Sequence, residues 1–172
     1  MTGRPVVLLG TSHMYQTAKE RCPPQHAQDF RCFLSEACRR YDIRTVAEEM
    51  NAEALAEVSR NESIPQQVAS ELSLTHLFCD PDRGERKHLG LLQENEVKAQ
   101  AFLNRISDDE TARRIHDEYV KRERFWLERL RTVNKWPVLF ICGAEHVMSF
   151  ESILEADGFS VRRIADDWAP TS

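Results

Sequence analysis

The chain has 172 residues, a length typical of one globular domain that buries about two thirds of its unfolded surface. Its composition, 41% apolar and 30% charged with six Gly and seven Pro, excludes disordered, membrane-embedded, fibrous and low-complexity classes. The formal charge of −5 argues against a global basic face, so we expect neither nucleic acid nor a membrane as a partner.

The first residues and the cysteines indicate a cytoplasmic protein. The apolar run 6–9 is too short for the core of a signal peptide or for a membrane span. The five cysteines are odd in number and lack C-x-x-C spacing, which favours reduced thiols over a disulfide framework or a structural zinc site.

Apolar runs alternate with helical patterns along the chain. Strands are predicted at 6–10, 43–49, 74–79, 138–143 and 160–164. The first is an apolar run typical of a strand buried on both faces, and 138–143 repeats its pattern. The helical patterns cover 25–40, 52–59, 65–72, 93–133 with a break at 107–109, and about ten residues that end at 156. The charged run 83–88 is expected to be a loop. This order predicts a single α/β domain over 1–172 in three layers, a mostly parallel twisted sheet of about five strands with helices on both faces.

The motif G-x-x-H occurs after two of the predicted strands. Gly10 and Gly143 close these strands, and His13 and His146 follow three residues later. The carboxyl ends of parallel strands share one edge, so adjacent first and fourth strands would bring both imidazoles to one pocket. Two imidazoles and a carboxylate are a common ligand set for Zn, Mn or Fe and also a workable acid–base group. The alternative is that each His only caps a turn.

Carboxylates also follow the predicted strands. Glu48 and Glu49 close the second strand, and because strand side chains alternate faces, only one of them can point towards the histidines. The alternative is that they supply negative charge to the start of the next helix. Asp80 follows the third strand, and Arg86 lies in the charged run after it. Glu48, Asp80 and Arg86 are therefore candidate ligand-binding residues.

The longest predicted helix carries one narrow apolar stripe that includes Tyr119, Trp126 and Leu130. Glu123 falls inside this stripe, and Arg122 lies at its border. A carboxylate on a buried face needs a cation, hydrogen-bond donors or a metal, so this segment is a candidate for the floor of the pocket. The alternative is a buried Arg122–Glu123 pair that fixes the position of the helix.

In chain order these motifs resemble the TraB/PrgY/Tiki superfamily, to which erythromycin esterase and ChaN-like haem-binding proteins are related. The matching segments are Gly10–His13, Glu49-Met50, Arg122-Glu123 before Trp126, and Gly143–His146. The resemblance implies an active centre of His13, His146 and Glu49, with Glu48 as the alternative acid. It also implies that this centre is metal-dependent, as in the Tiki proteases, or a His/Glu hydrolytic site, as in the esterases.

These inferences predict a small cytoplasmic hydrolase that acts on a small-molecule or peptide substrate. His13, Glu49 and His146 would hold a divalent metal (Zn, Mn or Fe) or act directly on water, and Glu123 or Arg122 would stabilise the developing anion. The alternative function is a non-catalytic module that binds a small anionic or nucleotide-like ligand in the same pocket. The sequence leaves open which reaction is catalysed and whether the chain forms an oligomer.

Overall fold

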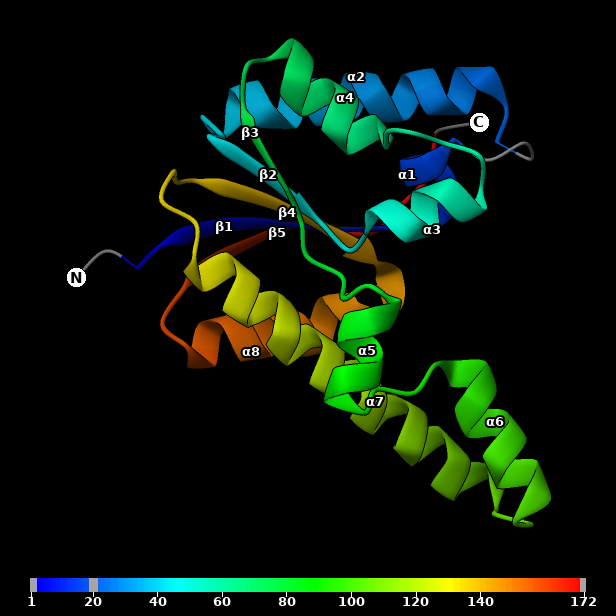
Figure 1. The fold of residues 1–172 in the computed structure, drawn as a ribbon. Coiled ribbons are helices and arrows are strands. Elements are labelled where there is room, and N and C mark those ends of the chain that lie inside the picture. The colour runs from blue at the N-terminus through cyan, green and yellow to red at the C-terminus, as the bar shows by residue number, and fades with distance from the viewer. Residues whose placement is uncertain (1–2, 19–21, 171–172) are drawn as a thin grey trace.

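The computed structural model describes residues 3–18 and 22–170, so residues 1–2, 19–21 and 171–172 of the predicted domain lie outside the described residues. Five strands form one sheet in the order β3-β2-β4-β1-β5, and all neighbouring strands are parallel (Figure 1). The strands are β1 Pro5–Thr11, β2 Thr45–Glu48, β3 Thr75–Phe78, β4 Val138–Gly143 and β5 Ser160–Trp168. The predicted α/β fold is confirmed, and the last strand is longer than the predicted 160–164.

Helices fill the connections between the strands. They are α1 His13–Thr17, α2 Pro24–Arg40, α3 Ala52–Glu57, α4 Ile64–Glu71, α5 Arg83–Leu89, α6 Glu94–Leu103, α7 Asp108–Arg131, the short 3-10 helix η1 Ala144–His146, and α8 Val147–Ala156. The break predicted at 107–109 is the start of α7, where the Ser107 hydroxyl accepts a hydrogen bond from the Glu110 amide. No described helix combines the length and the apolar character that crossing a bilayer requires.

The prediction of a loop at 83–88 is wrong, because these residues form α5. Asp82 accepts a hydrogen bond from the amide of Glu85 at 2.8 Å, and the Glu85 side chain accepts one from the amide of Asp82 at 3.1 Å. This capping box satisfies free amide donors at the start of the helix, and Gly90 ends the helix in the left-handed conformation. The D-x-x-E spacing was therefore a stronger signal than the density of charge.

Two apolar cores cover the two faces of the sheet. On one face, α2 and α4 pack against the sheet through Phe30, Leu34, Val68 and their neighbours. On the other face, α7 and α8 pack against Phe140 of β4 and its neighbours through Trp126, Leu130, Phe150 and Leu154. Figure 1 shows the resulting three layers, and it also shows α6 and the first half of α7 projecting from the body as a hairpin.

The register of the central strands brings the two G-x-x-H motifs side by side. β1 and β4 are neighbours, with Gly10 opposite Cys142 and Thr11 opposite Gly143. A Cβ atom at Gly10 would lie 1.9 Å from the backbone oxygen of Asp166, so only glycine allows β5 to approach this closely. The two histidines therefore start from one edge of the sheet, as predicted.

Candidate active site

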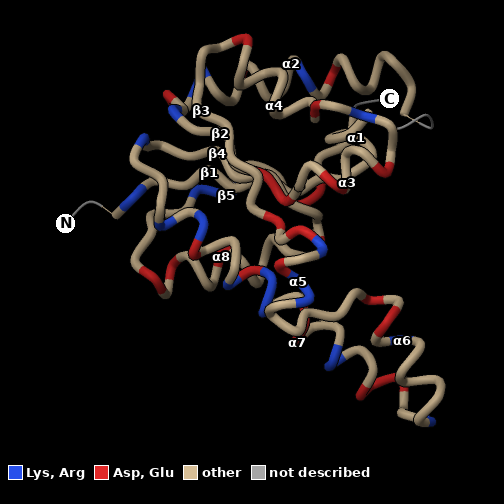
Figure 2. Tube along the Cα trace, viewed as in Figure 1, with Lys and Arg blue, Asp and Glu red and all other residues tan. Residues whose placement is uncertain are grey.

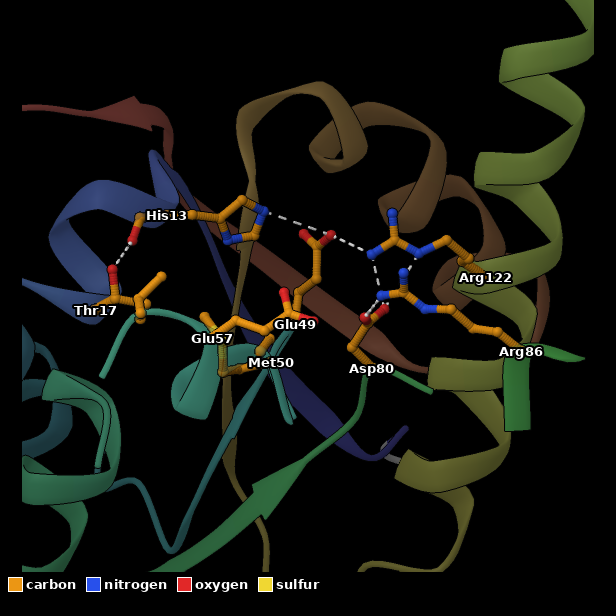
Figure 3. Close-up of a pocket in the computed structure, with 10 residues that line it drawn as sticks. His13, Thr17, Glu49, Met50, Glu57, Asp80, Arg86 and Arg122 are labelled. Atoms are coloured by element: carbon orange, nitrogen blue, oxygen red, sulfur yellow. Dashed lines mark hydrogen bonds and ion pairs between the residues drawn. The ribbon is translucent and has the colours of Figure 1, made fainter. Parts of the chain in front are cut away.

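A cavity of about 220 Å³ lies at the carboxyl ends of the strands (Figure 3). Residues from five separate segments converge on it: His13 from α1, Glu49 after β2, Asp80 after β3, Arg86 from α5 and Arg122 from α7. A second cavity of similar size shares His13, Glu49, Arg86 and Arg122 with the first, so this cluster is accessible from two sides. The α/β rule that ligands gather beyond the carboxyl ends of parallel strands makes this the candidate active site.

The Glu49 carboxylate is the centre of this cluster. Its Oε2 accepts a hydrogen bond from the amide of Gly143 at 2.7 Å, and its Oε1 accepts one from Nη2 of Arg122 at 2.7 Å. Burial favours the neutral acid, but the close contact with His13 and the positive charge of Arg122 outweigh burial. They hold the pKa of Glu49 well below its usual range, so Glu49 is a carboxylate at neutral pH.

His13 faces this carboxylate from the cavity side. Its Nε2 lies 3.6 Å from Oε1 of Glu49, and its Nδ1 lies 2.7 Å from Oε1 of Gln16. Burial disfavours the imidazolium, but the close contact with the Glu49 carboxylate and its negative charge prevail and raise the pKa of His13 to about 9. The side chain is 41% exposed, so a protonated imidazole is available to a ligand in the cavity at neutral pH.

His146 faces the same carboxylate from inside the protein. Its Nε2 lies 3.5 Å from Oε1 of Glu49, and its Nδ1 donates to Oε1 of Glu123 at 2.7 Å. Ser149 Oγ donates to the same Glu123 oxygen at 2.6 Å. His146 is not among the residues that line the two cavities, and its Nε2 has no hydrogen-bond partner among the described residues. It therefore lies behind Glu49.

Arg122 is held by two carboxylates, neither of which belongs to its own helix. Besides Glu49, it donates to Oδ1 of Asp80 through Nη2 at 2.7 Å and through Nε at 3.2 Å. Trp126 Nε1 donates to the same Asp80 oxygen at 3.2 Å, and Arg86 donates to the other Asp80 oxygen. The Arg122–Glu123 pair considered from the sequence is not formed, because successive residues of a helix point in different directions.

Glu48 points away from the cavity and is buried in a separate network. Its carboxylate accepts hydrogen bonds from Ser63 Oγ, from His76 Nε2 at 2.8 Å and from Gln16 Nε2 at 3.3 Å. Since the Gln16 amide nitrogen is taken by Glu48, its oxygen is left to accept from His13. Of the two acids at the end of β2, Glu49 therefore faces His13 and His146, whereas Glu48 is linked to His13 only through Gln16.

Sequence reasoning missed Gln16, Ser63 and His76. Gln16 lies on the single-turn helix α1. Ser12 caps the start of this helix, where its hydroxyl oxygen accepts a hydrogen bond from the amide of Met14. That cap was a readable local signal. The contacts of Ser63 and His76 with Glu48 join residues 15 and 28 positions apart and have no signature in a single sequence.

No family model, curated protein or solved structure matches this chain. The resemblance to the TraB/PrgY/Tiki superfamily stays a prediction that rests on the motifs themselves.

The metal ligands implied by that resemblance are His13, Glu49 and His146. Their arrangement does not fit a metal centre, because Arg122 donates to Oε1 of Glu49, the oxygen that both imidazoles face. In the part of the chain that the structure describes, no three His, Cys, Asp or Glu side chains are grouped closely enough to hold a metal ion. Metal binding stays a prediction, which metal analysis of the purified protein tests.

Proposed function

We propose that this protein is a small hydrolase in which His13 and Glu49 form the acid–base pair. One observation carries the proposal: two imidazole Nε2 atoms and one guanidinium surround a single carboxylate oxygen of Glu49, at 3.6, 3.5 and 2.7 Å. This cluster of side chains combines a carboxylate that can accept a proton with an imidazolium that can donate one. It borders a cavity that a small substrate can enter.

The two residues have complementary roles in the proposed reaction. Glu49 accepts a proton from a water molecule as the water oxygen bonds to the carbonyl carbon or phosphorus of the substrate. His13, protonated at neutral pH because its pKa is raised to about 9, gives its proton to the leaving group as the scissile bond breaks. The proton on Glu49 then returns to His13 across 3.6 Å, so both residues recover their starting states.

Arg122, His146 and Glu123 support this pair. Arg122 lines the cavity and offers the positive charge that stabilises the developing anion. Glu123 orients His146 towards Glu49 from behind, as carboxylates commonly orient histidines in hydrolytic sites. In this proposal His146 and Glu123 are positioning residues, because neither side chain touches the cavity.

A second candidate function is the binding of a small anion without catalysis. The observation that favours it is the presence of three cationic side chains on one cavity, His13, Arg86 and Arg122. The two arginines are already held in place by Asp80, so they would meet an anionic ligand with little loss of side-chain entropy.

A panel of chromogenic substrates separates the two functions. We would measure hydrolysis of a p-nitrophenyl ester, a p-nitroanilide and p-nitrophenyl mono- and diesters of phosphate by the wild type, His13→Gln and a control. The control is His116→Gln, a substitution of an exposed histidine on α7 that does not line the cavities. We expect turnover of at least one substrate, a loss of about 10²-fold or more in His13→Gln, and no change in the control.

Absence of turnover with every substrate, or full activity of His13→Gln, would rule out the proposed hydrolase function. Calorimetric titration with inorganic phosphate and citrate would then test the second candidate, which predicts binding by the wild type and its loss in Arg86→Gln.

A further inference from the structure

The hairpin of α6 and α7 presents an apolar surface well away from the candidate active site. Phe102 and Leu103, the last two residues of α6, are 85% and 78% exposed. They are two of the four large apolar side chains that are exposed among the described residues, and they are adjacent. The hairpin projects from the body of the molecule (Figure 1), so its tip is open to another molecule.

A groove runs between the two helices beside these side chains. It has a volume of about 650 Å³, and its apolar walls are Ala101, Phe102, Ile106, Ala112 and Ile115. This volume is large enough to receive the side chains of Phe102 and Leu103. Single exposed apolar residues are common on protein surfaces, whereas an apolar groove beside two exposed apolar side chains is typical of a binding surface. The hairpin therefore carries both a projection and a hollow that can receive one.

The charges at the edge of the groove have both signs. Arg105 follows α6, Asp108 begins α7, and both line the groove. Neither forms an ion pair with any residue in the described ranges 3–18 and 22–170, although most other charged residues of the hairpin are paired within it. Figure 2 shows blue and red segments along the same hairpin. A partner surface with charges of a single sign could form an ion pair with only one of these two residues.

We propose that this surface binds a second copy of the chain through a two-fold axis. A two-fold interface requires a self-complementary patch, in which residue i of one copy meets residue j of the other and the reverse contact also forms. The hairpin meets this requirement because Phe102 and Leu103 of each copy can enter the groove of the other, and Arg105 of each copy can pair with Asp108 of the other. The resulting four-helix contact is a common way for helical hairpins to bury apolar surface.

The first test is the mass of the purified full chain in solution across a wide range of concentrations. We expect twice the chain mass of 19.9 kDa at high concentration. Phe102→Asp and Leu103→Asp should each weaken the dimer roughly thirtyfold or more, because a charge in the apolar groove is desolvated without a partner. Met148→Asp is the matched control, since Met148 is 61% exposed but lies on α8. It should leave the dimer unchanged, and circular dichroism should show that all three variants are folded.

The second test addresses the ion pairs. Arg105→Asp and Asp108→Arg should each weaken the dimer about tenfold, whereas the double variant should recover most of the affinity because the two charges are exchanged. A wild-type chain that stays monomeric at every concentration would overturn the proposal, since another molecule would then have to cover this surface. A dimer insensitive to Phe102→Asp, or a double variant without recovery, would also overturn it. None of these outcomes depends on hydrolytic activity.

Discussion

Nδ1 of His146 lies 2.7 Å from Oε1 of Glu123, and neither side chain reaches solvent. One residue comes from the 3-10 helix after β4 and the other from the middle of α7, so this hydrogen bond joins the sheet edge to the longest helix. It also aims the remaining ring nitrogen of His146 at Glu49. The same contact therefore contributes to stability and to the geometry of the candidate site.

Removing Glu123 should destabilise the fold. Glu123→Ala deletes the acceptor of His146 Nδ1 and leaves this buried donor unpaired. It also removes one acceptor of the half-buried Ser149 hydroxyl, which keeps the carbonyl oxygen of His146 at 3.2 Å as a second acceptor. We expect the free energy of unfolding to fall by about 3 kcal/mol. Urea denaturation measures this change, with Glu128→Ala as the control because Glu128 is exposed on the same helix. Equal stability of the two variants would show that the pair contributes little.

Replacing Arg122 by lysine should be costly even though the charge is kept. The guanidinium donates to Glu49 and Asp80 at the same time, and an ammonium cannot reproduce this planar arrangement. We expect a loss of about 2 kcal/mol in the free energy of unfolding and a lower rate of hydrolysis. Arg124→Lys, an exposed substitution on α7, should change neither quantity. Wild-type behaviour of Arg122→Lys would mean that only the charge matters.

The His13–Glu49 ion pair should make stability depend on pH. The pKa of His13 is raised from 6.5 to about 9 in the folded protein and that of Glu49 is lowered from 4.5, so the pair contributes fully between about pH 4.5 and 6.5. Between pH 6.5 and about 9 the folded chain holds a proton that the unfolded chain has released, and the contribution is lost as pH rises. Urea denaturation of the wild type should show this decline, and His13→Gln should lack it. Identical pH dependence of both proteins would contradict the raised pKa.

Gln16 should act as a positioning residue for His13. Its oxygen accepts from His13 Nδ1 because Glu48 holds its nitrogen. Gln16→Leu keeps a similar volume but removes this orientation, so we expect kcat to fall about tenfold to a hundredfold with little change in KM. Gln25→Leu, at an exposed position of α2, is the control. A change in KM alone would indicate that Gln16 affects substrate binding instead.

Chelation separates the direct mechanism from a metal-dependent one. Since Arg122 occupies the Glu49 oxygen that a metal would need, we expect hydrolysis to be unchanged after dialysis against EDTA. If activity disappears and returns with Zn²⁺, Mn²⁺ or Fe²⁺, the metal ligands implied by the family resemblance are correct and Arg122 must move when the metal binds.

The sequence was informative wherever the signal was local and periodic. The buried strands β1 and β4, the G-x-x-H motif that follows each of them, and the polar position Glu123 on the apolar stripe of α7 could all be predicted from spacing. The convergence of His13 and His146 also followed, because parallel strands share their carboxyl edge.

What could not be predicted is which side chains pair across the fold. Arg122 has Glu123 as its neighbour in sequence, yet its partners are Glu49 and Asp80, more than forty positions away. The choice between Glu48 and Glu49 likewise depends on which face of β2 each occupies, and alternation alone says only that they differ. Partners of this kind are set by the packing of α7 across the sheet edge.

If Glu49 is the base of the proposed hydrolytic centre, Glu49→Gln should remove most of the hydrolytic activity. This variant keeps the size of the side chain and one oxygen for the Gly143 amide, but it removes the charge that faces His13 and Arg122. With the best chromogenic substrate we predict a fall in kcat of about 10²- to 10⁴-fold in protein that thermal unfolding shows to be folded at the assay temperature. A folded Glu49→Gln variant with the wild-type rate would show that Glu49 is not the base.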